Sequence, residues 1–218
     1  MLAKTLAAAA AALALAGTAQ ATTVYNNGAP QAGGLEVTLD RVLNDFTLSA
    51  DTNLTGAGVY LGRNISEGWD GAFQYSIWSS NAGSPGEILA EGSADIMPVE
   101  VDNDPFGFPV FLFQFDFASA FKAQAGVTYF LGVHAAADYD RRVGISWVAT
   151  DDNGTLNAQD QSHGTGAMAA INQEHAFFLV GDAVSAAPEP QAWALMILGF
   201  GAAGAMLRRR QGAALRAA

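Results

Sequence analysis

The chain has 218 residues, no cysteine and a formal net charge of −11 at pH 7. The lack of cysteine excludes disulfides, thiol chemistry, zinc–thiolate sites and attachment of a lipid to a cysteine. The acidic balance argues against nucleic acid and anionic lipid as partners, because a negatively charged surface repels both.

The first 21 residues have the three parts of an export signal. Lys4 supplies the positive start, Leu6 to Ala16 the apolar region, and Ala19-Gln20-Ala21 the small-residue cleavage site. We therefore expect residues 1–21 to be a signal peptide that is cleaved after Ala21. The alternative is an N-terminal anchor helix, but the apolar run is short for a span and no basic stop follows it.

The segment that follows, residues 22–185, is long enough for one domain with a sizeable core. It is strongly acidic: residues 22–187 hold 20 of the 21 acidic residues and 5 of the 10 basic ones, so 5 − 20 gives a net charge of −15. No window of twelve residues shows helical periodicity, and strand-like runs alternate with turn clusters. The runs are Leu35–Val42, Asp45–Leu48, Leu54–Gly62, Phe73–Ser79, Glu87–Ala94, Phe108–Phe117, Gly126–His134, Val143–Thr150 and His175–Gly181.

This pattern predicts an all-β fold, an antiparallel β-sandwich of eight or nine strands. At this length a jelly-roll-like arrangement is expected in preference to a seven-stranded immunoglobulin-like one. The clearest strand is Phe108–Phe117, in which alternate phenylalanines share one face that must be buried. Trp78 and Trp147 lie within strands and are expected to join the core.

The C-terminal segment contains sixteen consecutive uncharged residues, Ala192 to Leu207. As a helix it would be about 24 Å long, against about 30 Å for the hydrocarbon core of a bilayer. We predict a short transmembrane helix over 192–207, with Trp193 at one interface and Arg208, Arg209 and Arg210 at the cytoplasmic one. Residues 211–218 then form a cytoplasmic tail, and the domain lies outside the inner membrane. The alternative is a buried core helix with a basic end.

The same segment carries a resemblance to a known family. Pro188-Glu189-Pro190, Trp193, the glycine-rich apolar helix and the Arg208–Arg210 cluster stand in the order typical of a PEP-CTERM sorting signal, and residues 186–210 resemble that signal. The resemblance implies a Gram-negative bacterium that makes exopolysaccharide. It also implies cleavage near the motif by an exosortase, a membrane transpeptidase-like enzyme that passes the protein from the inner membrane to the cell surface or matrix. On this interpretation the triplet is a substrate tag.

A weaker resemblance concerns the domain itself. Four short segments look like strands and turns of the sandwich domains common in PEP-CTERM surface proteins: Asp45–Leu48, Ile77–Ser79, Ser84–Gly86 and Ala125–Tyr129. This resemblance supports the predicted fold but does not indicate which ligand the domain binds.

The domain shows no catalytic signature. It has no Gly-x-Ser-x-Gly elbow, no phosphate-binding glycine loop and no His-Glu-x-x-His pair. His134 and His175 fall in strand-like runs and are expected to be satisfied core or rim residues, whereas His163 is expected in an exposed loop. Acidic loops at 102–104, 138–140 and 151–154 leave calcium as an alternative to ordinary turns, but none has EF-hand spacing. We therefore predict no catalytic residue, no cofactor and no metal site.

Two aromatic residues in turns are the candidate ligand-binding residues, Trp69 and Tyr139, because aromatic faces on loops can stack on sugar rings. Both are expected to be exposed, and the site is expected on loops at one end of the sandwich. The expected partners are the exosortase and the inner membrane before processing, and then a neutral glycan or a matrix protein. The sequence thus predicts an exported surface or matrix protein with a non-catalytic binding or structural role. The alternative is a secreted glycan-acting enzyme on the same scaffold.

Overall fold

A computed structural model describes residues 22–31, 33–62, 68–101, 109–151 and 158–183, together with Leu198 and Phe200. Every strand belongs to the first of two units of the chain, which ends at Ala183. The strands are β1 (Thr22–Asn26), β2 (Gly34–Glu36), β3 (Asp40–Thr47), β4 (Thr52–Gly62), β5 (Gln74–Asn81), β6 (Ser84–Ser93), β7 (Val99–Val101), β8 (Val110–Ala123), β9 (Thr128–His134), β10 (Ser146–Thr150), β11 (Ala158–Ser162), β12 (Met168–Ile171), β13 (Glu174–His175) and β14 (Phe177–Ala183).

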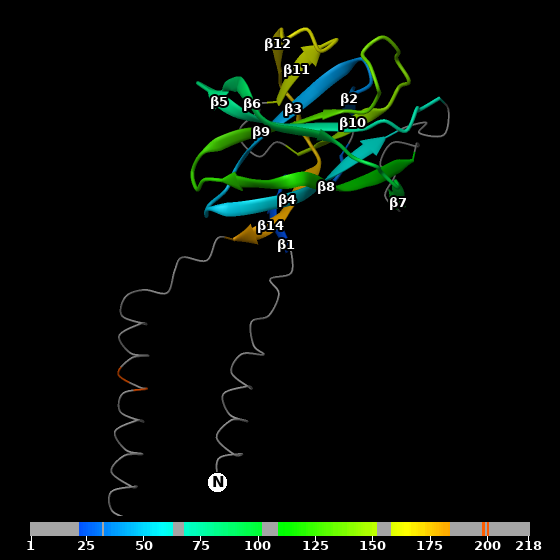
Figure 1. The fold of residues 1–218 in the computed structure, drawn as a ribbon. Coiled ribbons are helices and arrows are strands. Elements are labelled where there is room, and N and C mark those ends of the chain that lie inside the picture. Colours follow the sequence, from blue (N-terminus) through cyan, green and yellow to red (C-terminus); the bar gives the residue numbers. More distant parts are fainter. Residues whose placement is uncertain are drawn as a thin grey trace, which may run out of the picture. The chain divides into compact units, whose positions relative to one another are not determined.

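The fold is all-β, as the sequence predicted, and its two antiparallel sheets form a β-sandwich (Figure 1). The eight-stranded sheet has the order β1-β14-β4-β10-β13, with β8 also on β4, β7 on β8 and β2 on β10. The six-stranded sheet has the order β12-β11-β3-β9-β5-β6. The described residues thus contain fourteen strands rather than eight or nine, because several of the additional strands are short segments of two to five residues.

Eight of the strands pair in a nested order around the turn between β5 and β6. β5 pairs with β6, β4 with β8, β3 with β9 and β1 with β14, and all four pairs are antiparallel. The chain therefore behaves as one long hairpin whose two arms alternate between the sheets. This topology places strands distant in sequence, such as β3 and β9, side by side.

The main core lies between the sheets and is rich in aromatic residues. Phe113 and Phe115 of β8 pack against Phe73, with ring centroids 5.7 and 4.9 Å away, and Tyr75 stacks on Phe117 at 4.9 Å. The predicted burial of the phenylalanine face of β8 is confirmed for these three residues, all at most 8% exposed. Trp147 is also fully buried in this core, as expected.

The chain turns sharply between β2 and β3, where the sequence predicted one strand over Leu35–Val42. The Glu36 carboxylate accepts hydrogen bonds from the backbone N–H of Leu39 at 2.9 Å and of Thr38 at 3.2 Å. These bonds fix a corner that sends β2 to the eight-stranded sheet and β3 to the six-stranded sheet. The predicted break before Asp45 is wrong, because β3 continues unbroken to Thr47.

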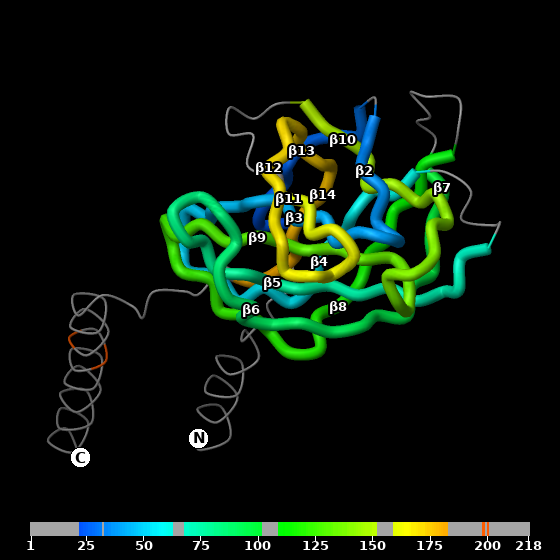
Figure 2. Tube along the Cα trace, turned by 90° about the horizontal axis from the view of Figure 1, so that it is seen from above, coloured from blue at the N-terminus to red at the C-terminus, as the bar shows by residue number. Residues whose placement is uncertain are grey.

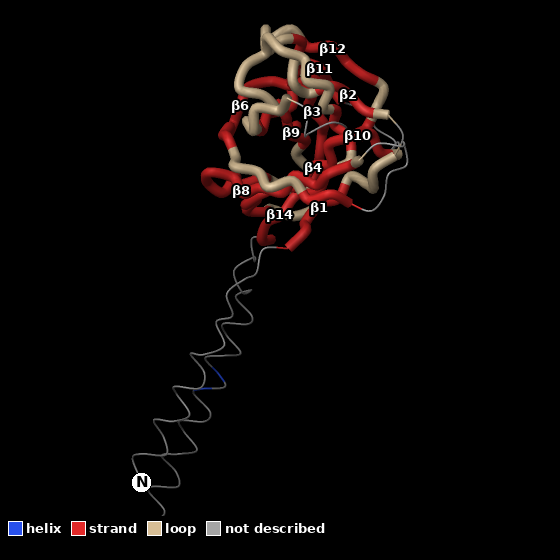
Figure 3. Tube along the Cα trace, turned by 90° about the vertical axis from the view of Figure 1, so that its right-hand side faces the viewer, coloured by secondary structure: helices blue, strands red, loops and turns tan. Residues whose placement is uncertain are grey.

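The six-stranded sheet curls until its first strand, β12, contacts its last strand, β6. Figure 2 shows the β11–β12 hairpin lying over β3 and β9, and Figure 3 shows it on the side away from β4, β8 and β14. A second small hydrophobic cluster fills the curl: Leu43, Trp78 and Phe130, with Met168 packed against it. This sheet therefore buries apolar side chains on both of its faces, and the predicted burial of Trp78 is confirmed.

The two terminal predictions lie outside the described residues. These are the signal peptide with Ala19 and Ala21, and the sorting signal with Pro188, Glu189, Pro190, Trp193 and Arg208–Arg210. Within the predicted span, Leu198 and Phe200 are described, and both are exposed. A search limited to the described part of the chain finds no helix long and apolar enough to cross a bilayer.

Candidate functional site

The candidate site is an open pocket on the curled face of the six-stranded sheet, which we call the curl pocket. Its lining residues are Arg41 of β3, Gln74 and Tyr75 of β5, and Glu91, Gly92 and Ser93 of β6, around a volume of about 330 Å³. Side chains alternate along a strand, so Arg41 points away from the main core that Val42 enters. The same alternation puts Gln74 on the curled face, because Phe73 and Tyr75 belong to the core.

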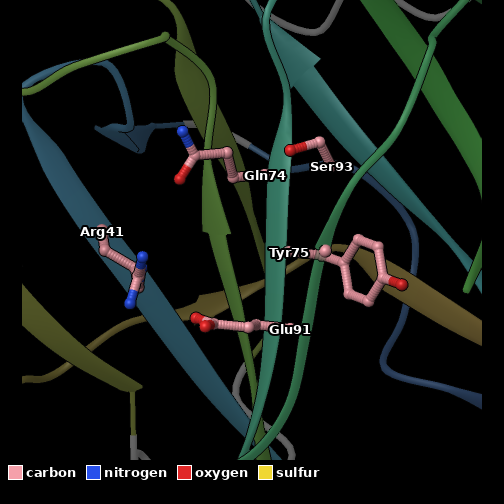
Figure 4. Close-up of a pocket in the computed structure, with 6 residues that line it drawn as sticks. Arg41, Gln74, Tyr75, Glu91 and Ser93 are labelled. Carbon is pink, nitrogen blue, oxygen red and sulfur yellow. The ribbon is translucent and has the colours of Figure 1, made fainter. Parts of the chain in front are cut away.

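The pairing register brings the two walls of the pocket together. Gln74 lies opposite His134 of β9 on one side and Ser93 of β6 on the other, and Glu91 lies opposite Ser76. Figure 4 shows the side chains of Gln74 and Glu91 extending toward Arg41, whereas the Tyr75 ring points the other way. The pocket thus places a guanidinium and a carboxylate on facing walls, with an amide and a hydroxyl beside them.

Arg41 is held by aromatic rings rather than by an acid. Its guanidinium carbon lies 5.9 Å from the ring centroids of both Trp78 and Tyr139, within the range of a cation–π interaction. Among the residues that the structure describes, no carboxylate is within ion-pair distance of Arg41. No described carboxylate therefore neutralises the charge of the guanidinium.

The two rings beside Arg41 are themselves fixed. Trp78 Nε1 donates to Ser76 Oγ at 2.8 Å. Tyr139 stacks on His134 with the centroids 3.8 Å apart, and His134 Nε2 bonds to the Thr38 carbonyl oxygen at 3.0 Å. Since a carbonyl oxygen only accepts, this bond assigns the proton of the neutral imidazole to Nε2. The aromatic support of Arg41 is therefore rigid.

Burial determines the protonation states of His134 and Tyr139. It lowers the pKa of His134 below its ordinary value of 6.5, and the positive charge of Arg41 acts in the same direction. Burial also raises the pKa of the Tyr139 hydroxyl above 10.0, although the nearby Arg41 opposes that shift. Both groups are therefore neutral near pH 7, and Arg41 and Glu91 provide the charges of the pocket.

The structure places Tyr139 differently from the exposed loop residue that the sequence suggested. One face of its ring covers His134, and a Cβ added at Gly164, in the β11–β12 turn, would come within 2.7 Å of the ring. The ring is half-buried between the sheet and this turn. The expectation of exposure is therefore wrong, and Tyr139 contributes to the site through Arg41.

Trp69 is likewise half-buried, so its expected exposure is also wrong. Its Nε1 lies 3.1 Å from the carbonyl oxygens of both Ala72 and Ala135, and its ring centroid lies 5.3 Å from that of Phe113. The turn Glu67-Gly68-Trp69-Asp70-Gly71 suggested a surface loop, but the indole folds back onto the core. Trp69 and Tyr139 do share one loop region, because Asp70 Oδ2 accepts from the Ala137 N–H at 3.0 Å.

A second polar cluster lies buried between the sheets. The Glu174 carboxylate accepts from the side-chain amides of Asn27 at 2.9 Å and Asn44 at 2.6 Å, and the Asn44 oxygen accepts from the His175 N–H at 2.8 Å. Tyr25 donates to Asn27 at 2.8 Å, and its pKa is raised by burial and by the charges of Asp45 and Glu174. The cluster joins β1, β3 and β13 and is structural, because Asn44, Glu174 and His175 are at most 1% exposed.

The histidines and the acidic segments are the remaining candidates from the sequence. His134 and His175 are fully buried and His163 is exposed, as predicted; His163 lies 3.7 Å from Asp40. The acidic segments 102–104 and 152–154 lie outside the described residues. Within the described ranges, no group of three or more His, Asp or Glu side chains is placed to hold a metal ion.

Four residues of the curl pocket were not among the candidates predicted from the sequence: Arg41, Gln74, Glu91 and Ser93. Each lies in a segment with strand character, where polar side chains are read as the solvated face. A usable signal was present in the neighbouring positions, since Leu43 and Trp78 on the same face are large and apolar. A sheet face that carries large apolar residues beside a single arginine is partly covered by other parts of the chain, whereas a solvated face is polar throughout.

Comparison with known proteins leaves the chain without an assigned family. No family model matches it, and neither does any curated protein.

Proposed function

We propose that this chain is an exported protein of the bacterial cell surface or extracellular matrix, and that its β-sandwich is a binding module. The observation that carries the binding role is the curl pocket, an open polar hollow whose facing walls hold Arg41 and Glu91. Binding residues on a rigid sheet need little reorganisation when a partner arrives. The partner is a neutral glycan or another matrix protein, and nucleic acid is excluded by the charge of −15 on residues 22–187.

We also infer that the sandwich is a jelly roll. The four nested antiparallel pairs support this assignment, since rolling up one long hairpin over two sheets produces such an order. A jelly roll presents broad sheet faces as well as end loops. That property fits a site on a curled sheet face.

Binding is preferred over glycan hydrolysis because of the carboxylates in the pocket. Most glycoside hydrolases use two carboxyl groups that flank the scissile bond, about 5–10 Å apart. Of the six lining residues, Glu91 alone carries a carboxylate. The enzyme alternative would instead require release of reducing sugar from the organism's own matrix.

Delivery rests on the two terminal segments. Residues 1–21 direct export, and residues 186–210, with Pro188-Glu189-Pro190 and the arginine cluster, direct recognition by an exosortase at the inner membrane. The helix over 192–207 holds the precursor in that membrane until cleavage. The released protein then reaches the surface or matrix of a Gram-negative bacterium.

We expect Glu189→Ala, or removal of Arg208 to Arg210, to leave the protein in the inner membrane fraction. The tag needs the Pro-Glu-Pro triplet for recognition and the basic cluster for orientation. Fractionation of cells and matrix, followed by immunoblotting, measures the distribution. Glu87→Ala, at an exposed position of β6, is the control and should be delivered normally. Normal delivery of both tail variants would refute sorting by this segment.

We expect the wild-type protein to sediment with isolated matrix of the source organism and to release no reducing sugar from it. Binding without turnover distinguishes a binding module from the enzyme alternative. The measurement pairs co-sedimentation with a reducing-end assay on the same sample, and bovine serum albumin serves as the non-binding reference. A protein that remains in the supernatant would contradict the binding role.

A further inference from the structure

We propose that the curl pocket binds a neutral polyhydroxylated ligand, one pyranose unit of a glycan, between the Arg41 guanidinium and the Glu91 carboxylate. This inference deepens the proposed binding function and rests on it. It moves the site away from the end loops, where Trp69 and Tyr139 had suggested it, to the curled face formed by β3, β5 and β6.

The hydrogen-bonding chemistry of the walls selects the ligand class. Arg41 can only donate and ionised Glu91 can only accept, whereas the Ser93 hydroxyl can do both. Gln74 offers its side-chain oxygen as an acceptor, because its Nε2 already donates to the carbonyl oxygens of Ala136 and Ala137. A sugar hydroxyl also donates and accepts, so neighbouring hydroxyls of one ring can satisfy both walls at once. An anionic ligand would pair with Arg41 but would meet the Glu91 carboxylate, and a cation would meet the reverse conflict.

The pocket has the size and openness for such a ligand. Its volume of about 330 Å³ is at the lower end of the range for small-molecule sites, roughly 300–1,000 Å³. That space suits one sugar ring with its hydroxyl groups. Because the pocket opens to solvent, the rest of a polysaccharide chain can continue out of it.

The site is organised before the ligand arrives. Arg41 faces two immobilised rings, Trp78 and Tyr139, at 5.9 Å each. Holding a flexible arginine in this way removes part of the entropic cost of ordering it on binding. The β11–β12 turn contributes indirectly, since Gly164 lies against the Tyr139 ring that supports Arg41.

The test measures binding of glucose, galactose and mannose, and of glucuronic and galacturonic acid, to the full chain by calorimetry. The chain is kept in a polyoxyethylene detergent, because a detergent with a sugar headgroup would compete for the site. We expect at least one neutral sugar to bind the wild type, and more tightly than either uronic acid. Arg41→Met and Glu91→Gln should each weaken that binding about tenfold or more, the effect of removing a hydrogen bond to a charged group.

Two matched variants serve as controls. Glu87→Gln makes the same change as Glu91→Gln on the same strand but outside the pocket, and Arg142→Met removes an exposed arginine elsewhere. Both should bind the sugar within twofold of the wild type. Glu91 is exposed, so Glu91→Gln is expected to fold normally and decides the question if Arg41→Met does not fold.

The possible failures can be told apart by including matrix co-sedimentation. If the wild type binds matrix but none of the neutral sugars, or if Glu91→Gln binds the sugar as the wild type does, the pocket assignment is overturned and the binding function stands. Tighter binding of the uronic acids overturns the ligand class. If the wild type binds neither sugar nor matrix, the proposed function itself fails.

Discussion

Trp147→Ala is expected to lower the free energy of unfolding by about 3–5 kcal/mol, the usual cost of truncating a buried aromatic residue. Trp147 is fully buried, its ring centroid lies 5.1 Å from that of His175 and 5.7 Å from that of Phe177, and its Nε1 donates to the Ala176 carbonyl at 2.9 Å. The change would leave a cavity and remove one of the two hydrogen bonds to the Ala176 carbonyl, which would keep the bond from the Tyr60 N–H at 3.2 Å. Since domains of this size are stable by roughly 5–15 kcal/mol, such a loss is large.

Urea unfolding followed by circular dichroism measures this loss of unfolding free energy. Two further truncations, at positions of lower burial, provide values for comparison. Trp69→Ala removes a half-buried indole that also packs on the core, so it should cost less than Trp147→Ala but more than a surface change. Leu89→Ala truncates a side chain that is 45% exposed, and it should stay within about 0.5 kcal/mol of the wild type. Equal effects of the three substitutions would contradict the packing described here.

β8 is a strand that the sequence predicted well because its environment differs between its two faces. In β8, Phe113, Phe115 and Phe117 are buried, whereas Gln114 and Asp116 between them are exposed. Period-two alternation reports this contrast directly. Alternation of this kind indicates the all-β class and the sandwich. Trp78, Trp147, His134 and His175 lie instead in strands with buried residues on both faces, and their burial was predicted from the strand-like character of their segments.

The strands that were missed owe their structure to their neighbours. β11 (Ala158–Ser162) and β12 (Met168–Ile171) are rich in alanine and glutamine and have little intrinsic strand preference. They form because β3 offers an unpaired edge, which β11 covers through four paired positions. Gln159 and Gln161 become buried only because the sheet curls. No local pattern in the sequence encodes that curl.

The candidate site was missed for a related reason. Arg41 and Glu91 are fifty residues apart in the chain, and they face one another only because β3 and β6 are joined through β9 and β5. A shift of register by one residue in any of these pairs would turn the side chains to the other face. Trp69, in contrast, was predicted to be a binding residue but packs on the core. Its turn sequence, rich in glycine and aspartate, does not show that the indole folds back onto the core.

The second large effect is expected from pH. Burial lowers the pKa of His175 from its ordinary value of 6.5 to about 3, because the fully enclosed ring cannot be hydrated when charged. The unfolded chain therefore takes up a proton on this ring at a pH where the folded chain does not. The stabilisation is complete above pH 6.5 and is lost as the pH falls from 6.5 toward 3.

At pH 4.5, two units below the ordinary pKa, the loss from His175 amounts to about 2–3 kcal/mol. His134 contributes with the same sign, since burial lowers its pKa too, whereas Asp160 acts in the opposite direction because burial raises its carboxyl pKa. The pH dependence of the unfolding free energy therefore includes contributions from several titrating groups. The share of His175 must be isolated by comparing a variant with the wild type.

His175→Phe makes that comparison while keeping an aromatic ring beside Trp147. The backbone N–H of residue 175 can still donate to the Asn44 side chain, so the buried cluster loses only the ring's own contact at 3.1 Å. Between pH 6.5 and 4, the slope of unfolding free energy against pH should then fall by about 1.4 kcal/mol per pH unit, the value for one proton. Urea titrations at half-unit steps of pH measure the slope. Parallel curves for the two proteins would show that His175 is not the group that the fold keeps neutral, because its titration would then be the same in the folded and unfolded chain.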